Sequence, residues 1–363
     1  MFAAEIFLKD WRNIPEINFR PDPAINIFLG RNAQGKTNIL EAINFATLLR
    51  SRAGKESELI RWTKEAALVR INFFKAGVSH TLAIEISAER PRRIFLDANL
   101  IRPRELVGKL NSVLFSPEDL FLFKGSPVAR RKFLDAQISQ ASPIYFFDLL
   151  KYNRIVEQRN ALLKKIRDGS AKSNELELWD EQLSLTAEKI LRKRLASVQK
   201  LNLLAAAAQE KISSHAENLS VVYEMRGLDE EENLAEKFLE LLRAKRFDDI
   251  KNGATLKGPH RDDLKFFVNG RELKIFGSQG QLRTVALALK LSELQFLKSE
   301  TGEYPLLLLD DVMSELDGAR REMLLEFLRR EKIQTLITAT DRAYFPPQSF
   351  GKFFSVEEGR LTQ

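Results

Sequence analysis

One short motif constrains the fold of this chain more than any other feature. Gly30 to Thr37 read G-x-x-x-x-G-K-T, after the apolar run INIFL and before a segment whose pattern predicts a helix from Lys36. The glycines let backbone amides approach phosphate oxygens, and a helix start favours negative charge. Lys36 would then reach the β and γ phosphates of a nucleotide, and Thr37 would ligate Mg²⁺. The alternative is a plain glycine-rich turn with an exposed lysine. The loop residues expected to bind nucleotide are Gly30, Arg31, Asn32, Ala33, Gln34, Gly35, Lys36, Thr37 and Asn38.

The run PLLLLDDV supplies a second part of the predicted site. Leu306 to Leu309 predict a strand buried on both faces, and Asp310 at its end would hold Mg²⁺ directly or through water. Asp311 stands where ATP-hydrolysing proteins usually carry a glutamate that orients the attacking water. The alternative role for Asp311 is a cap on the following turn.

The segment FGSQGQLRTVAL contributes a third motif. Ser278, Gly280 and Gln281 precede a helix predicted near 281 to 298, so a hydroxyl, a backbone amide and a helix start can meet one anion. The motif resembles the signature of ABC-type ATPases, which completes a nucleotide site by reaching across from a second subunit. Its position one helix before the aspartate strand, with SELD shortly afterwards, strengthens that interpretation.

The pattern of apolar residues changes twice along the 363 residues of the chain. Short apolar runs with alternating pattern predict strands up to about residue 115, long helical segments follow between about 143 and 250, and strands return from about 254. Alternating strands and helices near the end imply a parallel sheet with crossover helices. We therefore predict a discontinuous nucleotide-binding domain, 1–115 and 254–363, and an inserted helical arm domain, 116–253.

Composition narrows the function classes. The chain has no cysteine, which excludes disulfides and thiolate zinc sites, and no apolar run approaches the roughly 18 residues that span a bilayer. We therefore expect a cytoplasmic protein with no membrane partner. The net charge of +7 suggests an anionic partner. Segment 151–200 has 12 basic against 7 acidic residues, which makes the arm a candidate DNA-contacting surface.

Taken together, the motifs resemble the RecF family of bacterial recombination mediators, from residue 5 to about 358. The resemblance is carried by DWRNI, GRNAQGKTNILEAI, LFSPEDL, KGSPVARRKFLD, LKGPHRDDL, GSQGQLRTVALALKL, LLLLDDVMSELD and ITATD. It implies an α/β fold in which an ABC-type ATPase head, a mixed sheet with a P-loop, carries an inserted helical arm domain.

The resemblance also implies roles for single residues. Arg12 would lie near the ATP phosphates or base, Asp311 would be the catalytic carboxylate, and Ser278 with Gln281 would act in trans. Lys36, Thr37 and Asp310 keep the phosphate and Mg²⁺ roles given above. Related ABC ATPases often place a γ-phosphate-sensing histidine after the final core strand, where this chain offers Thr340. The loop glutamine that joins Mg²⁺ and water in those relatives is missing from LFSPEDLFLF, and Glu118 or Asp119 is the candidate substitute.

Two further groups allow both a structural and a functional reading. His260 in GPHRDD is either a phosphate-sensing residue or a structural histidine satisfied by its polar neighbours. Arg130, Arg131 and Lys132 either touch a DNA backbone or form a solvated face.

The function implied is a weak DNA-dependent ATPase that forms an ATP-dependent homodimer, binds duplex or gapped DNA and helps load recombinase together with the partner RecR. Hydrolysis would be coupled to dimerisation and DNA release. One alternative is the ATPase subunit of a membrane transporter, but such subunits place only roughly 100 residues between the two motifs. Here Thr37 and Ser278 are 241 positions apart. The other alternative, a chromosome-maintenance ATPase, needs a far longer coiled coil.

Overall fold

The computed structural model describes residues 1–363 apart from 50–54, 229–231, 347–350 and 363. The chain forms two compact units. The first unit comprises Met1–Leu120, Lys211–Ser214 and Gln279–Gln363, and the second comprises Phe121–Glu210 and His215–Ser278. Residues from both ends of the chain therefore build the first unit.

An antiparallel sheet forms one layer of the first unit. Its strands alternate buried and exposed positions, as β4 does, because one face packs on the core and the other meets solvent. In spatial order the strands are β2 (Ile14–Phe19), β1 (Phe2–Trp11), β4 (Ala66–Lys75), β5 (Val78–Ser87), β6 (Arg93–Leu96) and β7 (Asn99–Ile101).

A second sheet of the first unit carries the predicted nucleotide motifs. All neighbouring pairs in it are parallel except β14 with β15. Every residue of β12 and β13 is buried, as the continuous apolar run of β12 predicts for a strand covered on both faces. The spatial order is β15 (Arg360–Thr362), β14 (Lys352–Glu357), β3 (Ile25–Leu29), β13 (Thr335–Ala339), β12 (Leu306–Asp310) and β8 (Ser112–Phe115).

Helices connect and cover these sheets. The predicted helix after the phosphate loop is α1 (Lys36–Leu48), and the helix after the serine motif is α10 (Gln279–Thr301). The remaining helices of the first unit are η1 (Glu56–Leu59), α2 (Pro103–Leu106), η2 (Pro117–Leu120), α11 (Val312–Glu315), α12 (Gly318–Glu331) and η4 (Arg342–Tyr344).

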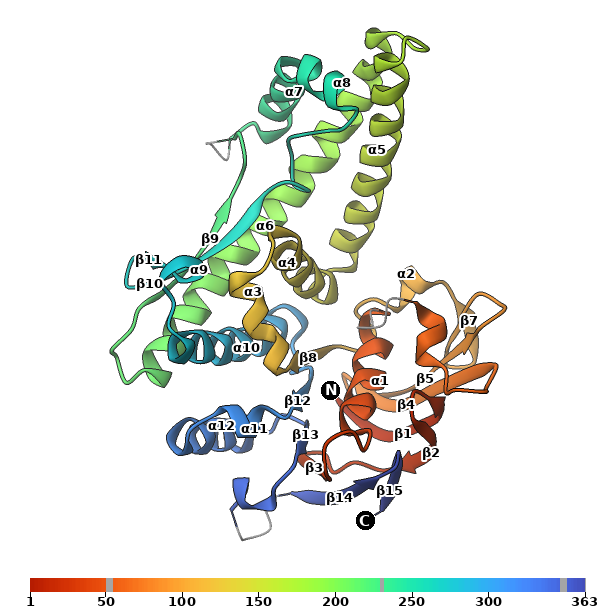
Figure 1. Cartoon of the computed structure of the whole chain (residues 1–363), viewed down its shortest axis with the longest axis vertical. Helices are drawn as coiled ribbons and strands as arrows, with labels where there is room; N and C mark the ends of the chain where they lie inside the picture. Colours follow the sequence, from red (N-terminus) through yellow and green to blue (C-terminus); the bar gives the residue numbers. More distant parts are fainter. Residues whose placement is uncertain (50–54, 229–231, 347–350, 363) are drawn as a thin grey trace. The chain divides into compact units, whose positions relative to one another are not determined.

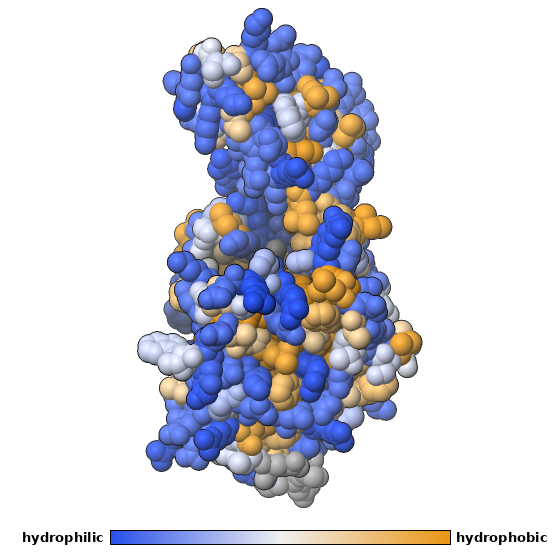
Figure 2. Space-filling model, turned by 90° about the vertical axis from the view of Figure 1, so that its right-hand side faces the viewer, coloured by the Kyte–Doolittle hydropathy of each residue, from blue (hydrophilic) through white to orange (hydrophobic). Residues whose placement is uncertain are grey.

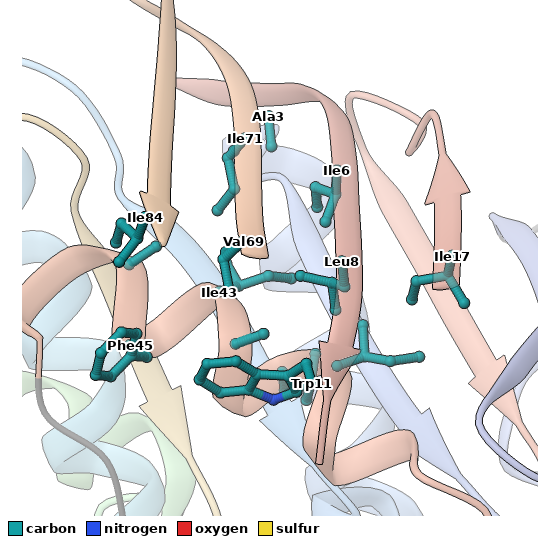
Figure 3. Close-up of a cluster of buried hydrophobic side chains, with 14 of the residues drawn as sticks. Ala3, Ile6, Leu8, Trp11, Ile17, Ile43, Phe45, Val69, Ile71 and Ile84 are labelled. Carbon is teal, nitrogen blue, oxygen red and sulfur yellow. The ribbon is translucent and has the colours of Figure 1, made fainter. Parts of the chain in front are cut away.

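The core of the first unit lies between the antiparallel sheet and α1. Figure 3 shows Ile6, Leu8 and Val69 from the strands on the same side as Ile43 of α1, with Trp11 at the end of β1. All five side chains are buried. Burying each contributes on the order of 2 kcal/mol, and the Trp11 indole also donates a 3.0 Å hydrogen bond to the carbonyl of Asn38. This packing fixes the strand end against the helix that follows the phosphate loop.

The second unit is mainly helical, and α5 and α6 are its two longest helices (Figure 1). The Arg159 guanidinium of α5 forms a 2.7 Å ion pair with Asp180 of α6. At 1.5 Å per residue, the 37 residues of α6 span roughly 55 Å. The elements are α3 (Phe121–Lys124), α4 (Pro127–Ala141), α5 (Pro143–Arg167), η3 (Ser173–Glu175), α6 (Leu176–Ile212), β9 (Leu219–Glu224), α7 (Leu234–Ala244), α8 (Arg246–Asn252), β10 (Asp263–Val268), β11 (Arg271–Glu272) and α9 (Leu273–Phe276).

The boundary between the units differs from the sequence prediction of 253/254. The strand β10 pairs antiparallel with β9, which follows α6, so residues 254–278 group with the helical unit. At the other junction the helical unit begins at Phe121 instead of residue 116. The strand pattern of DLKFFV is correct, but its pairing partner decides the unit to which it belongs, and β9 was not predicted.

The basic cluster in VARRKFLD is partly committed to internal bonds. Arg130 is buried, and its Nε and Nη2 donate to the two carboxylate oxygens of Asp263 at 2.8 Å each. Arg131 Nη1 donates to the Asp262 carbonyl at 2.6 Å. A buried bidentate pair cannot also hold a DNA phosphate, so the DNA interpretation of Arg130 is wrong.

His260 also has a structural environment. Its Nε2 lies 3.0 Å from the Thr255 carbonyl, which can only accept, so Nε2 carries the proton and Nδ1 accepts from the Tyr152 hydroxyl at 2.6 Å. Burial lowers the pKa of His260 to about 4. The structure therefore favours the structural reading of this histidine.

The neutral state of His260 predicts a loss of stability in acid. The unfolded chain takes up a proton below pH ~6.5, whereas the folded chain resists it down to about pH 4, so stability is lost as pH falls between these values. At pH 5 the loss is on the order of 2 kcal/mol. Urea unfolding at pH 7 and pH 5 should show this extra loss in the parent protein and not in His260→Gln. Equal pH dependence in both proteins would contradict the assignment.

No helix in the described part of the chain is long and apolar enough to cross a membrane. On the face that Figure 2 shows, hydrophilic side chains predominate and the apolar ones form separate patches.

Candidate nucleotide site

The phosphate loop joins the end of β3 to the start of α1 and depends on its two glycines. A Cβ on Gly30 would lie 2.4 Å from the carbonyl oxygen of Val356. Gly35, the residue before α1, has φ 105°, and a Cβ there would lie 2.7 Å from the Asn13 side chain. Neither position accepts a side chain, which explains the motif in terms of backbone packing.

Lys36 lies across this loop. Its side chain is buried, and Nζ donates to the carbonyls of Gly30 at 2.7 Å and Arg31 at 2.8 Å. Burial lowers the pKa of Lys36, while Asp311 and Asp310 raise it. An ammonium held against the loop in this way is a ready partner for phosphate oxygens.

Three polar side chains meet at the carboxyl end of the parallel sheet. Thr37 Oγ1 donates to Asp310 Oδ1 at 2.8 Å, and Thr338 Oγ1 donates to the same oxygen at 2.9 Å. Thr338 Oγ1 in turn accepts the backbone N–H of Asp311 at 2.9 Å. The structure therefore brings Thr37 and Asp310 together, 273 positions apart in the sequence, as the predicted Mg²⁺ pair requires.

The donor set at this edge fits Mg²⁺. Within the described residues, no group of three or more His, Cys, Asp or Glu side chains could hold a metal alone. One carboxylate and one hydroxyl, completed by phosphate oxygens and water, are what Mg²⁺ uses at nucleotide sites. Thr37 and Asp310 would supply those two protein ligands.

Asp311 occupies a strained and desolvated position beside this pair. Its φ is 54°, in the left-handed region, and it precedes α11 without making a side-chain cap bond. Burial raises the pKa of Asp311, Lys36 lowers it, and Asp310 raises it further. Among the described residues, nothing hydrogen-bonds to its buried Oδ1. Asp311 thus stands at the N-cap position of α11 without a side-chain cap bond, and its role stays a prediction. An unsatisfied buried carboxylate oxygen at a left-handed residue suggests a functional constraint.

Thr338 is the site residue that the sequence analysis missed. Thr340, which was predicted to stand in for a sensing histidine, is exposed just after β13. Thr338 pairs with Asp310 in the parallel register and makes the bonds described above. A buried threonine inside the strand LITA beside the aspartate strand was the available signal. The sensing role of Thr340 stays a prediction.

Arg12 lies beside α1 and binds a carboxylate. Its Nε and Nη2 donate to the two oxygens of Glu41 at 3.0 and 2.8 Å, one turn along the helix from Thr37. The backbone of Arg12 is left-handed, with φ 53°. The structure thus anchors the guanidinium to α1, and contact with ATP stays a prediction.

The other loop residues divide into anchors and exposed positions. Gln34 Oε1 accepts the backbone N–H of Glu358 at 2.8 Å, and Asn38 Nδ2 donates to Asn13 Oδ1 at 2.8 Å. These two side chains fasten the loop to neighbouring turns. The exposed positions are Arg31, Asn32 and Ala33.

The serine motif is displayed at the surface. Ser278 and Gly280 are exposed, and Gln281 is half-buried in the first turn of α10. Arg283, two residues further, forms a 2.8 Å ion pair with Glu315 of α11. Exposure at a helix start is what an anion supplied by another molecule needs.

Asp119 has a different role from the one predicted. Its Oδ1 lies 2.8 Å from Lys290 Nζ, and its Oδ2 accepts the backbone N–H of Ser116 at 2.7 Å. With both oxygens bound inside the protein, Asp119 is no free substitute for the missing glutamine. Glu118 is exposed.

Comparison with known proteins gives one consistent answer along the chain. A model of the RecF/RecN/SMC N terminal domain matches residues 2–357. The DNA replication and repair protein RecF of Halothermothrix orenii is 43% identical over 374 residues, covering 100% of this chain and 99% of that protein. RecF of Heliobacterium modesticaldum is 40% identical, covering 99% of this chain and 98% of that protein.

Comparison with solved structures also finds a RecF protein. The recombination mediator protein RecF with ATP, of the RecFOR pathway, matches with a TM-score of 0.91 and 36% identity, covering 99% of this chain and 97% of that chain. An Smc head bound to the C-winged helix domain of ScpA matches with a TM-score of 0.59 at 13% identity, covering 100% of this chain and 96% of that chain. The second likeness shows a shared fold only.

Proposed function

Since the chain belongs to the RecF family of DNA replication and repair proteins, we propose that ATP with Mg²⁺ binds at the Thr37–Asp310 edge and joins two copies on DNA. The observation that carries this proposal is the meeting of Thr37, Asp310 and Thr338 beside Lys36 and Asp311. The ATP bound by a 36% identical relative supports it.

Each residue has a distinct task in the proposed reaction. Lys36 would exchange its loop carbonyls for the β and γ phosphates, and Thr37 with Asp310 would hold the metal. Mg²⁺ held there would supply positive charge against the phosphate oxygens. Asp311 orients a water and takes its proton as the water oxygen bonds to the γ phosphorus and the bridging oxygen leaves with ADP. Thr338 holds Asp310 and the Asp311 backbone in register.

The second half of the site comes from another copy. The phosphate loop leaves the outer side of the γ phosphate exposed, and Ser278 with the start of α10 is suited to cover it. Two copies related by a two-fold axis would then enclose two nucleotides. Hydrolysis would remove the γ phosphate from both contacts and let the dimer and its DNA separate.

DNA binding is proposed to use phosphate contacts along α5. Lys151, Arg154, Lys164 and Lys165 are exposed on this helix. The sequence offers no base-reading motif, so the contacts would carry little sequence preference. Helping to load recombinase at gapped DNA, together with RecR in the cytoplasm, is the role that family membership supports.

DNA affinity should fall steeply with salt. Four phosphate contacts predict a log–log slope of about −3.6, or roughly a 100-fold loss between 50 and 200 mM salt. Replacing Lys151 and Arg154 by Gln should reduce the slope by about 2. Fluorescence anisotropy with a labelled duplex measures both values. The control is Lys332→Gln, because Lys332 is an exposed cation in the first unit, before β13 and away from the nucleotide edge of the sheet. A slope near zero, or an unchanged slope in the double variant, would refute the α5 contact.

Sedimentation tests the proposal as a whole. The protein is measured with ATP, with ADP and without nucleotide, each with and without duplex DNA. A dimer that needs ATP, and DNA binding that follows the dimer, support the proposal. A monomer under all six conditions would contradict it.

A further inference from the structure

A buried ion pair ties the loop after β8 to α10, and neither end of the pair belongs to the proposed catalytic set. Lys290 Nζ lies 2.8 Å from Asp119 Oδ1 and 3.1 Å from Glu293 Oε1. The side chains of Lys290, Asp119 and Glu293 are 8%, 20% and 6% exposed. All three residues belong to the first unit.

A gain in stability alone does not explain why the largely buried side chains of Lys290, Asp119 and Glu293 are charged. Burial would lower the pKa of Lys290, but Asp119 and Glu293 raise it above its usual value. Burial raises the pKa of Glu293 to about 7, although Lys290 lowers it. Replacing a buried ion pair by apolar groups is often neutral or stabilising, so the pair is better explained by the positions that it fixes.

One end of the pair lies at the nucleotide edge of the sheet. Phe115, the last residue of β8, pairs with Leu309 in parallel register, so Ser116 reaches the level of Asp310. Asp119 holds this loop by accepting the Ser116 N–H with Oδ2, while Oδ1 faces Lys290. A shift of the loop therefore moves the carboxylate that binds α10.

The other end lies on the helix that starts at the serine motif. Gln279 begins α10 directly after Ser278, and Lys290 is 11 residues further, roughly 17 Å along the axis. The ion pair of Arg283 with Glu315 holds the same helix nearer its start, on the segment that follows Asp311. Two ion pairs thus connect α10 to the short helices η2 and α11, which follow the neighbouring strands β8 and β12.

We propose that Asp119 and Lys290 are positioning residues. They couple the nucleotide site of one copy to the serine motif of the same copy, and that serine motif completes the nucleotide site of the second copy. This inference rests on the proposed ATP-dependent dimer. It makes the two nucleotide sites of the dimer interdependent, so ATP turnover is cooperative. Because the ion pair is desolvated and the helix is rigid, a small shift of the loop moves α10 and the serine motif at its start.

The test compares variants at both ends of the pair with a matched control on the same helix. Lys290→Met removes the cation, Asp119→Asn removes the charge while keeping an oxygen for Ser116, and Lys290→Arg keeps the charge. The control is Lys298→Met, because Lys298 forms an exposed ion pair with Glu331 near the far end of α10. For each protein we measure monomer ATP binding, ATP-dependent dimerisation and the Hill coefficient of ATP turnover on duplex DNA.

The parent protein and Lys298→Met should turn over ATP with a Hill coefficient near 2. Lys290→Met and Asp119→Asn should lower it to about 1 and weaken the ATP dimer roughly tenfold, within the usual range of coupling between sites. Monomer ATP binding should stay within about twofold, and Lys290→Arg should restore part of the cooperativity. A purely structural role would change the thermal midpoint without separating binding from cooperativity.

The outcomes separate this inference from the function on which it rests. A parent Hill coefficient of 1, or an unchanged coefficient and dimer in Asp119→Asn, overturns the transmission. If Lys290→Met fails to fold, Asp119→Asn decides by the same criteria. Ser278→Arg is measured alongside. If this variant still forms the ATP dimer, the proposed function itself fails. If Ser278→Arg loses the dimer but Asp119→Asn keeps the parent Hill coefficient and dimer, only the transmission is rejected.

Discussion

Ser278→Arg should abolish the ATP-dependent dimer while leaving ATP binding to the monomer nearly intact. Ser278 is exposed just before α10, so a larger side chain fits the free molecule. In the proposed dimer the same position faces a γ phosphate held by the other copy, and the bulk of arginine would keep the helix start from approaching it. We expect dimerisation to weaken by at least about 100-fold, measured by gel filtration with light scattering.

The control for this variant is Ser299→Arg, which places the same side chain on an exposed serine near the other end of α10. It should dimerise like the parent protein. An ATP-bound Ser278→Arg protein that dimerised normally would rule out the trans role of the serine motif. Loss of the dimer in both variants would point to general damage to α10.

Asp311→Asn should retain ATP and the ATP dimer but slow turnover about 100- to 1000-fold, the usual contribution of a general base. The amide has nearly the shape of the carboxylate, so the left-handed backbone and the bond from its N–H to Thr338 persist. What is lost is a proton acceptor whose pKa burial already raises. Single-turnover hydrolysis with pre-bound ATP measures the chemical step directly.

Asp22→Asn is the matched control, because Asp22 is an exposed aspartate that precedes β3 at the opposite edge of the sheet. Its turnover should equal that of the parent protein. If Asp311→Asn also hydrolysed ATP at the parent rate, Asp311 would have a structural role and the attacking water would be held elsewhere. Lys36→Ala differs from both, because it should weaken ATP binding itself.

The sequence by itself determined the elements whose cause is local. The phosphate loop was predictable because its glycines, its lysine and the following helix are neighbours, and α1 begins at Lys36 as expected. The leucine run predicted the buried strand β12, and the segment after the serine motif predicted the helix α10. Local propensity and apolar periodicity act within one or two turns of chain, so they can be recognised without a fold.

The tertiary structure decided which of these segments meet. Thr338 joins the site only because β13 pairs beside β12, and Arg12 turns to Glu41 because η1 and α1 pack against the end of β1. Residues 254–278 join the helical unit because β10 pairs with β9. Lys290 and Asp119 are 171 positions apart, and each alone resembles an ordinary surface charge. Pairing between distant segments depends on the packing of the whole unit, which no short stretch of sequence encodes.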